Sequence, residues 1–384
     1  MVSGRIPFPG IRPVARATVT PLASIFGSGF LIIVPVLERT LGGLAVVGAV
    51  AISAVAWMVG TAIRHNIRVV EPLVQANDLG RSSERLEAVS DMVIAIAYVI
   101  SVALYLRIMA EYIVDSISPG AGAAVSAIAA GGAAVIVLVG MTRGFRGLDL
   151  MERIALIAVL LLTTVLGTSY LVESSGQLLG EGINLPPVPD SSIVAIALTL
   201  GGVVITVQGF ETVRYLGDQF DAESRVWASR VAQAVATSIY VGFVLVATPL
   251  MGLGTPDGAD STLVDITERV APLLVIPLVV SATLSQFAAA TADTVAAREN
   301  LHRQFPKALA GSRAYALSGI AAIAMILTIP TFTIVTIASR AFAAYYCLQC
   351  VVAMRTAPSR PASAGFAVLA TLMALITLFA KPVG

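Results

Sequence analysis

The sequence predicts an all-α integral membrane protein with about eleven transmembrane helices, and three observations carry this prediction. Hydrophobic residues make up 57% of the 384 residues and charged residues 12%, with a mean hydropathy of +0.89. A water-soluble chain has about 25% charged residues. The apolar runs are long and apolar on every face, which excludes the alternating strands of a membrane barrel. Basic residues are abundant in every second loop, as in a multi-pass protein with a fixed orientation.

The position of each transmembrane helix follows from the runs of roughly 20 apolar residues that a bilayer crossing requires. These runs lie near 19–38, 42–63, 89–114, 121–141, 151–173, 190–217, 231–254, 271–298, 314–330, 331–354 and 363–380. Pro330 marks the boundary between the ninth and tenth helices. Residues 1–18 form a basic N-terminal arm, in which we find no apolar region followed by a signal-peptide cleavage site.

The distribution of basic residues predicts the orientation, because cytoplasmic loops carry the excess of Lys and Arg. The loops on the far side from the N-terminus contain only Arg39, Arg269 and Lys381. Three more basic residues fall within spans, and the other 18 of the 24 lie on the N-terminal side. We therefore expect a multi-pass protein of the cell (inner) membrane with a cytoplasmic N-terminus. The net charge of +1 gives no indication of a nucleic-acid partner.

Two long loops suggest an internal repeat. The loops near 65–88 and 253–270 each follow the second helix of a block of five, on opposite sides of the membrane. Inverted repeats give this pattern in many secondary transporters. We therefore predict a first repeat over 19–173, a second over 190–354, and an additional eleventh helix over 363–380.

The first span is interrupted at its centre by Gly27, Ser28 and Gly29. Glycine is unfavourable inside a helix, and a break in lipid is tolerated where the freed backbone groups line a cavity. The freed N–H groups of such a break bind anionic groups, for example a carboxylate. The alternative is close helix packing through small residues.

The sixth span, the first of the second repeat, is interrupted at Gln208, Gly209, Phe210 and Glu211. Paired interruptions at corresponding positions of two repeats indicate a transporter substrate site. We therefore expect the first and sixth helices to be unwound at their centres and to face each other.

Four motifs in order along the chain resemble those of the amino acid–polyamine–organocation transporter superfamily. They are Gly27-Ser28-Gly29-Phe30; Gly209-Phe210-Glu211 with Asp218 and Arg225; Ala296-Ala297-Arg298 with Pro306; and Tyr345, Tyr346 and Arg355. The resemblance covers essentially the whole chain. It implies the five-plus-five inverted-repeat fold first seen in bacterial leucine transporters, with one extra helix here.

The resemblance also implies roles for individual residues. The carboxylate-binding turn falls on Ser28 and Gly29, and the substrate-facing break of the sixth helix on Gln208, Gly209 and Phe210. The acidic residue that links gating to charge falls on Glu211. The sequence departs from the family at Arg214, Asp293 and Arg340, where ordinary amino acid carriers are neutral, so the resemblance leaves the substrate class open.

Charges inside membrane spans are costly and usually functional. The spans contain Arg107, Glu111, Glu211, Arg214, Asp293 and Arg340. Arg107 with Glu111, and Glu211 with Arg214, are spaced to pair along a helix, either functionally or as structural ion pairs. Asp293 and Arg340 have no local partner, so we expect them to pair with each other or one of them to meet the substrate, unless Arg340 snorkels to an interface.

These features predict a secondary active transporter, a permease for a small polar solute such as an amino acid or related amine, working by alternating access. No phosphate-binding loop of an ATPase is present. We favour proton coupling through Glu211 or Asp293, assisted by Arg214, or exchange. The alternative is a sodium symporter, for which Ser285 and Thr291 are weak candidates.

Other classes of function fit the sequence less well. A channel requires a continuous polar pathway, and a non-transporting solute sensor requires a soluble output domain. No nucleophile–base pair indicates an enzyme, and no cofactor or metal site is expected. Cys347 and Cys350 lie in an apolar stretch and are interpreted as packing residues, and His65 and His302 flank spans in Arg-containing loops.

Overall fold

The computed structural model describes the chain except residues 1–9, 116–120, 180–184, 204–206, 254–261 and 381–384. Its regular elements in the described residues are all helical. The long helices are α1 Ile11–Leu41, α2 Ala45–His65, α4 Arg81–Asp115, α5 Gly122–Leu179, α6 Ile193–Val203, α7 Ala222–Ala247, α9 Val275–Gln304, α10 Arg313–Thr328, α11 Thr331–Arg355 and α12 Arg360–Phe379. The short ones are η1 Gly42–Leu44, η2 Asn66–Val70, α3 Glu71–Gln75, η4 Phe210–Leu216, η5 Thr248–Leu253, α8 Thr262–Val270 and η6 Pro272–Leu274.

Every predicted span coincides with a helix or with part of one. The helix α5 covers both 121–141 and 151–173, and it bends at Gly144, whose φ of 58° and ψ of −152° are not helical. Of the described residues, seven helices are long and apolar enough to cross a membrane by length and composition, and Arg313–Thr328 is a shorter apolar helix. The all-helical membrane fold is confirmed, whereas the two inverted repeats stay a prediction.

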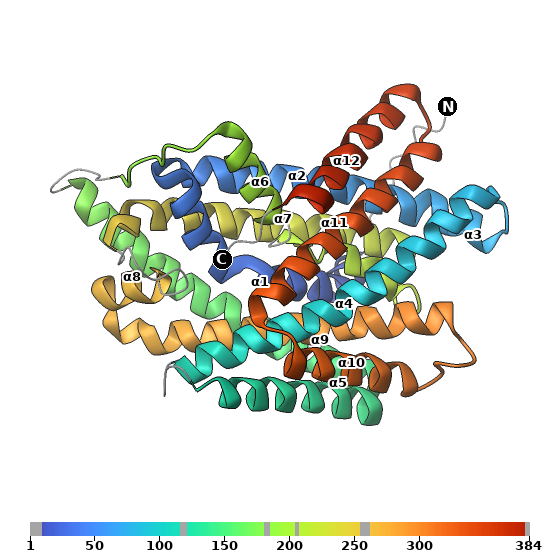
Figure 1. Ribbon diagram of the computed structural model, residues 1–384, viewed down its shortest axis with the longest axis horizontal. Coiled ribbons are helices and arrows are strands. Elements are labelled where there is room, and N and C mark those ends of the chain that lie inside the picture. The colour runs from blue at the N-terminus through green and yellow to red at the C-terminus, as the bar shows by residue number, and fades with distance from the viewer. Residues whose placement is uncertain (1–9, 116–120, 180–184, 204–206, 254–261, 381–384) are drawn as a thin grey trace.

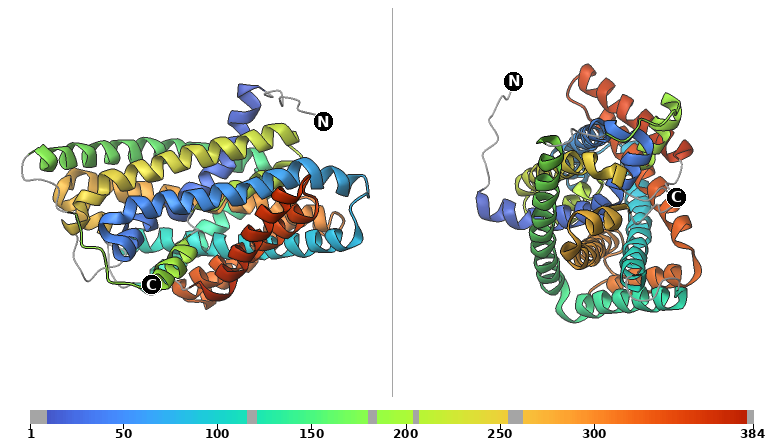
Figure 2. Two further views of the ribbon diagram at one scale, coloured as in Figure 1. Left: turned by 90° about the horizontal axis from the view of Figure 1, so that it is seen from above. Right: turned by 90° about the vertical axis from the view of Figure 1, so that its left-hand side faces the viewer.

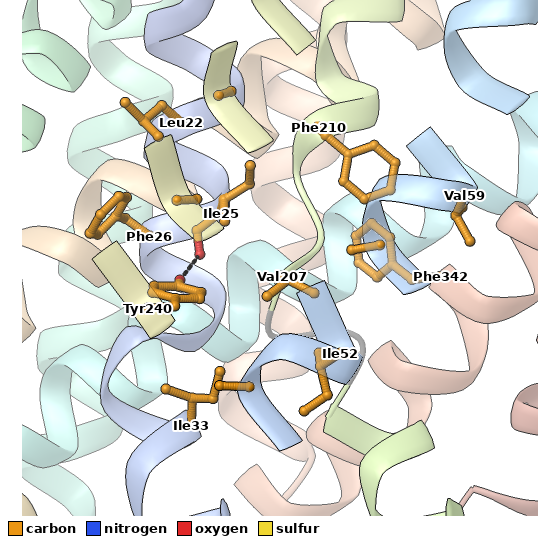
Figure 3. Close-up of a cluster of buried hydrophobic side chains, with 14 of the residues drawn as sticks. Leu22, Ile25, Phe26, Ile33, Ile52, Val59, Val207, Phe210, Tyr240 and Phe342 are labelled. Atoms are coloured by element: carbon orange, nitrogen blue, oxygen red, sulfur yellow. Dashed lines mark hydrogen bonds between the residues drawn. The ribbon is translucent and has the colours of Figure 1, made fainter. Parts of the chain in front are cut away.

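The helices form a bundle whose long axis is horizontal in Figure 1, with α3 at the right-hand end and α8 at the left (Figures 1 and 2). The helix α1 packs along α7 and α9, and α4 packs along α9 and α11. Buried apolar side chains surround α1 (Figure 3), among them Ile25 and Phe26 of α1, Ile52 of α2 and Phe342 of α11. The centre of α1 is therefore enclosed by protein rather than by lipid.

The structure corrects the prediction that the first helix is unwound. Residues Gly27–Gly29 lie within the continuous helix α1. A Cβ atom at Gly27 would lie 1.9 Å from the Cβ of Ala289 and 2.7 Å from the carbonyl oxygen of Ser285. Glycine at this position therefore allows α1 to approach α9 closely, which is the small-residue packing stated as the alternative.

The predicted interruption of the sixth helix is confirmed. The α-helix α6 ends at Val203, and the 3₁₀ helix η4 begins at Phe210. Between them, Gly209 has φ 121° and ψ −22°, a conformation that glycine adopts readily and residues with a side chain rarely do. The chain direction therefore changes at Gly209, where the sequence pattern placed the break.

Candidate functional site

The break in the sixth helix lies directly against α1. A Cβ atom at Gly209 would lie 2.7 Å from both the hydroxyl oxygen of Ser24 and the backbone nitrogen of Ile25. Gly209 is thus required twice, by its positive φ and by this close approach. The two segments that the sequence predicts to face each other meet at Ser24 and Gly209.

Glu211 follows this break and is fully buried. Its Oε2 atom accepts hydrogen bonds from the Tyr346 hydroxyl at 2.7 Å and from the backbone N–H of Gly209 at 2.8 Å. The Tyr98 hydroxyl lies 3.5 Å from Oε1. The carboxylate therefore folds back onto its own turn and is held by hydroxyl and amide donors.

Arg214, which the sequence predicts to pair with Glu211, is bound elsewhere, and that prediction is wrong. Its guanidinium donates to Glu87 of α4, and its Nε lies 3.8 Å from Glu71 of α3. Arg225 of α7 binds Glu71 at 2.6 Å and donates to the Arg214 carbonyl at 3.1 Å. Two carboxylates from other helices thus lie next to Arg214, and it interacts with them rather than with Glu211, its neighbour in sequence.

Asp293 of α9 is the second predicted coupling residue, and it too is fully buried. Its Oδ1 accepts a hydrogen bond from Ser24 of α1 at 2.7 Å, and its Oδ2 accepts one from Ser101 of α4. Ser101 lies one turn beyond Tyr98, the residue next to Glu211. The helix α4 thereby positions donors for both carboxylates.

Glu152 of α5 is a third buried carboxyl, which the sequence interpretation did not single out. Its Oε2 accepts a hydrogen bond from Thr20 of α1 at 2.7 Å, and its Oε1 is buried without a hydrogen-bond partner. Glu152 stands at the beginning of a predicted span, where a charge usually reaches the interface. In the structure Glu152 instead lies fully buried against Thr20 of α1.

We call Glu152, Glu211 and Asp293 the acidic cluster. Within the part of the chain that the structure describes, none of the three lies within ion-pair distance of a Lys or Arg. The described residues also include no group of three or more His, Cys, Asp or Glu placed to hold a metal ion. An ionised carboxylate in such surroundings costs several kcal/mol unless a cation or a proton accompanies it.

The backbone carbonyls at the centre of α1 complete the site. The carbonyl oxygen of Ile25 accepts from Tyr240 at 2.6 Å (Figure 3). Those of Phe26 and Gly27 accept from Ser285 at 3.2 Å and Gln286 at 2.7 Å. Sequence reasoning cannot find these donors, because they come from α7 and α9, far from α1 in the chain.

The other predicted substrate-binding residues are distributed around the break. Gln208 donates to the Tyr105 hydroxyl at 2.5 Å, and the Phe210 ring stacks on Tyr346 with centroids 5.4 Å apart. Gly29 is buried within α1. The side chain of Ser28 lies outside the described part of the structure.

The remaining predicted charges and hydroxyls contact residues outside the acidic cluster. Arg107 donates to Thr331 at 2.7 Å, and Thr331 donates to Glu111 at 2.6 Å, so both charges contact the beginning of α11. Arg340 is exposed and forms no ion pair with Asp293. Thr291 donates to Phe287 of its own helix at 2.8 Å.

Comparison with solved structures shows which fold this is. The chain superimposes on MhsT in complex with L-phenylalanine with a TM-score of 0.69 at 12% identity, over 98% of this chain and all of that one. A mutant of the Eremococcus coleocola manganese transporter superimposes with a TM-score of 0.63 at 10% identity, over 98% of this chain and 88% of that one. A Na⁺-coupled sialic acid symporter superimposes with a TM-score of 0.59 at 10% identity, over 99% of this chain and 92% of that one. The fold is therefore leucine-transporter-like.

Comparison with sequences shows the family. The chain is 32% identical over 300 residues to an uncharacterized protein of Aquifex aeolicus (strain VF5). The aligned region covers 76% of this chain and 71% of the relative. The family model described as "APC superfamily transporter" matches residues 11–380. The chain therefore belongs to the amino acid–polyamine–organocation (APC) superfamily of transporters.

Proposed function

We propose that this protein is a secondary active transporter of a small amine-bearing solute, coupled to protons and working by alternating access. One observation carries the proposal: Glu211 and Asp293 flank the break at Gly209, fully buried and without a basic partner in the described structure. Such a pair favours a cationic guest, either the ammonium group of a substrate or a proton.

The continuity of α1 favours an amine over a substrate recognised by its carboxylate alone. Gly27–Gly29 lie in a continuous helix, so the anion-binding turn expected there is not formed in this conformation. The carboxylates of the acidic cluster are complementary to an ammonium group, which donates three hydrogen bonds. The neighbour MhsT is bound to L-phenylalanine, a ligand with such a group. An amine or an amino acid held mainly through its amine fits both facts.

Proton coupling follows from the same carboxylates. A proton neutralises a buried carboxyl group and lets the site close without substrate, and a cationic substrate then replaces it. The sodium alternative has less support, because Ser285 donates to α1 whereas Thr291 donates to its own helix, so they do not form one oxygen set here.

Uptake into proteoliposomes under an imposed pH gradient tests the proposal. Labelled amines and amino acids would be screened first by the thermal shift they cause, since a ligand of the folded state stabilises it. We expect Glu211→Gln to remove the pH dependence of uptake while substrate exchange persists, and Glu173→Gln, an exposed carboxyl of α5, to change neither.

The decisive outcome concerns both carboxyls together. If uptake driven by the gradient keeps its pH profile in Glu211→Gln and in Asp293→Asn, proton coupling at this site is wrong, and sodium coupling or plain exchange replaces it. A Gly29→Leu variant tests the predicted substrate site separately: we expect the bulky side chain, in the buried part of α1, to abolish the thermal shift in a protein that still folds.

A further inference from the structure

A cavity of about 430 Å³ opens between α2 and α7, at the end of the bundle that carries α3, on the right in Figure 1. Trp57, Thr61, Arg64 and Arg68 line it from one face of α2 and its continuation, because residues spaced three or four apart share a helix face. Arg230 lines it from α7. This end of the bundle is the one predicted to be cytoplasmic, and the acidic cluster takes no part in the cavity.

The cavity has an excess of positive charge, because three arginines line it and only one of them pairs with a carboxylate among the described residues. Arg68 pairs with Glu223 at 2.9 Å. Arg64 and Arg230 have no carboxylate within ion-pair distance among the described residues. Guanidinium groups this close repel one another, and an anion between them relieves the repulsion.

Arg64 is held in position by the protein and is only 4% exposed. Its guanidinium donates to Gln233 of α7 and, at 3.1 Å, to the Trp57 carbonyl, and it lies 5.0 Å from the centroid of the Trp57 ring. A Cβ atom at Gly60 would lie 2.7 Å from its Nη1 atom, so the glycine makes room for it. The charge is therefore preorganised rather than left to a mobile surface side chain.

The mouth of the cavity has the character of a membrane interface. The side chains of Trp57 and Met58 are 39% and 44% exposed, and Val50, two turns back along α2, is 50% exposed. Tryptophan is enriched where lipid headgroups begin, and basic pockets between transmembrane helices bind anionic headgroups. Arginine binds phosphate oxygens in a bidentate manner.

We propose that this cavity, bounded by Trp57, Arg64, Arg68 and Arg230, binds a phosphate anion carried by the headgroup of an anionic membrane lipid. The acyl chains of that lipid lie along the apolar outer face of α2. Soluble phosphate shares the same chemistry but makes no use of this apolar face.

Thermal unfolding of purified, delipidated protein tests the proposal. Dioleoylphosphatidylglycerol is compared with zwitterionic dioleoylphosphatidylcholine and with inorganic phosphate. We expect phosphatidylglycerol to raise the unfolding temperature and phosphatidylcholine not to. Arg230→Gln should weaken the apparent affinity for phosphatidylglycerol about fivefold, since one basic residue near an anionic headgroup contributes about that factor.

The matched control is Arg360→Gln, which removes an exposed arginine at the beginning of α12, and it should keep the full response. Arg230→Lys should keep part of it, because the charge remains but the bidentate contact with phosphate is lost. Arg230 is chosen because Arg64 supports the packing of α2 on α7. A shift by inorganic phosphate that needs Arg230, with no response to phosphatidylglycerol, would keep the anion site but overturn the lipid as its ligand. No shift by any anion, or an equal shift in wild type and Arg230→Gln, overturns the proposal.

Discussion

Two groups of buried charge in this protein differ in their balance. The acidic cluster at the centre combines three carboxyl groups with hydroxyl and amide donors. Near the α3 end, Glu71, Glu87, Arg214 and Arg225 form a second group, which we call the ion-pair network, with two acids and two bases in contact. Burial is similar in both. The network balances its negative charges with positive ones, whereas the cluster has no Lys or Arg within ion-pair distance among the described residues.

We assign a structural role to the ion-pair network and a functional role to the acidic cluster. A balanced buried network pins the elements that contribute to it, here α3, α4, η4 and α7, and removing one partner is costly. An unbalanced set is retained where a charge must enter and leave. The two meet in η4, where Glu211 belongs to the cluster and Arg214 to the network. If Glu211 binds a cation as proposed, that cation contacts the same short helix that the network holds.

The largest expected effect comes from unbalancing the network. Arg214→Met should lower the free energy of unfolding by about 3–5 kcal/mol, because it leaves Glu87 buried without its partner. Denaturant unfolding in detergent measures the loss. The double variant Arg214→Met, Glu87→Gln should recover much of it. A single variant as stable as the wild type would show that the network is not structural.

A smaller effect is expected beside the acidic cluster, where packing rather than ion pairing holds α1. Gly27→Ala should cost about 1–3 kcal/mol, because the added methyl group overpacks the contact with Ala289. Combining it with Ala289→Gly should restore stability, which thermal unfolding can measure. If Gly27→Ala alone is neutral, α1 and α9 are not in close contact.

A third prediction concerns an exposed carboxyl group, Asp221, whose contribution to stability can be compared with those of the two buried groups. Asp221 caps α7 by accepting a hydrogen bond from the Ser224 N–H at 2.9 Å, so Asp221→Ala should cost about 1 kcal/mol. Hydrogen bonds from Ser224 lower the pKa of Asp221 below its ordinary value of 3.8. The contribution is therefore complete above pH 3.8 and is lost as the pH falls through the lower folded-state pKa. Unfolding measured against pH checks this, and an equal difference at every pH contradicts it.

The smallest effect on stability is expected within the acidic cluster. Asp293→Asn should leave the free energy of unfolding unchanged or raise it, because the amide keeps the shape while removing a charge that has no basic partner. Thermal unfolding of this variant is compared with that of Arg214→Met. A loss as large as that of Arg214→Met would erase the distinction between the two groups.

Much of the fold was predictable because it depends on local patterns. Apolar runs fix the helices, and Gln208 and Glu211 in an apolar span mark a real break. The Gly27–Gly29 segment shows the limit, since the same residues suit an unwound turn or a close helix contact. Ala289, on a distant helix, selects the close contact in this structure.

The charges of the site were predictable individually but not in their pairing. Glu211 and Arg214 are spaced to pair. Glu71 and Glu87 bind Arg214 instead, and both lie in the segment near 65–88 that was predicted to be a loop. Glu152 was missed because it stands at the beginning of a predicted span, and its burial depends on contact with α1. Partner choice among buried charges is a tertiary property, which spacing along one helix does not determine.

The carbonyl groups at the centre of α1 have a consequence for how that helix can change shape. Ile25, Phe26 and Gly27 already accept side-chain hydrogen bonds from α7 and α9. If the helical bonds to these three carbonyls opened, the oxygens would keep partners, so the usual penalty for an unpaired buried carbonyl would be avoided. Opening α1 at its centre therefore costs less than it would if these three carbonyls had only helical partners.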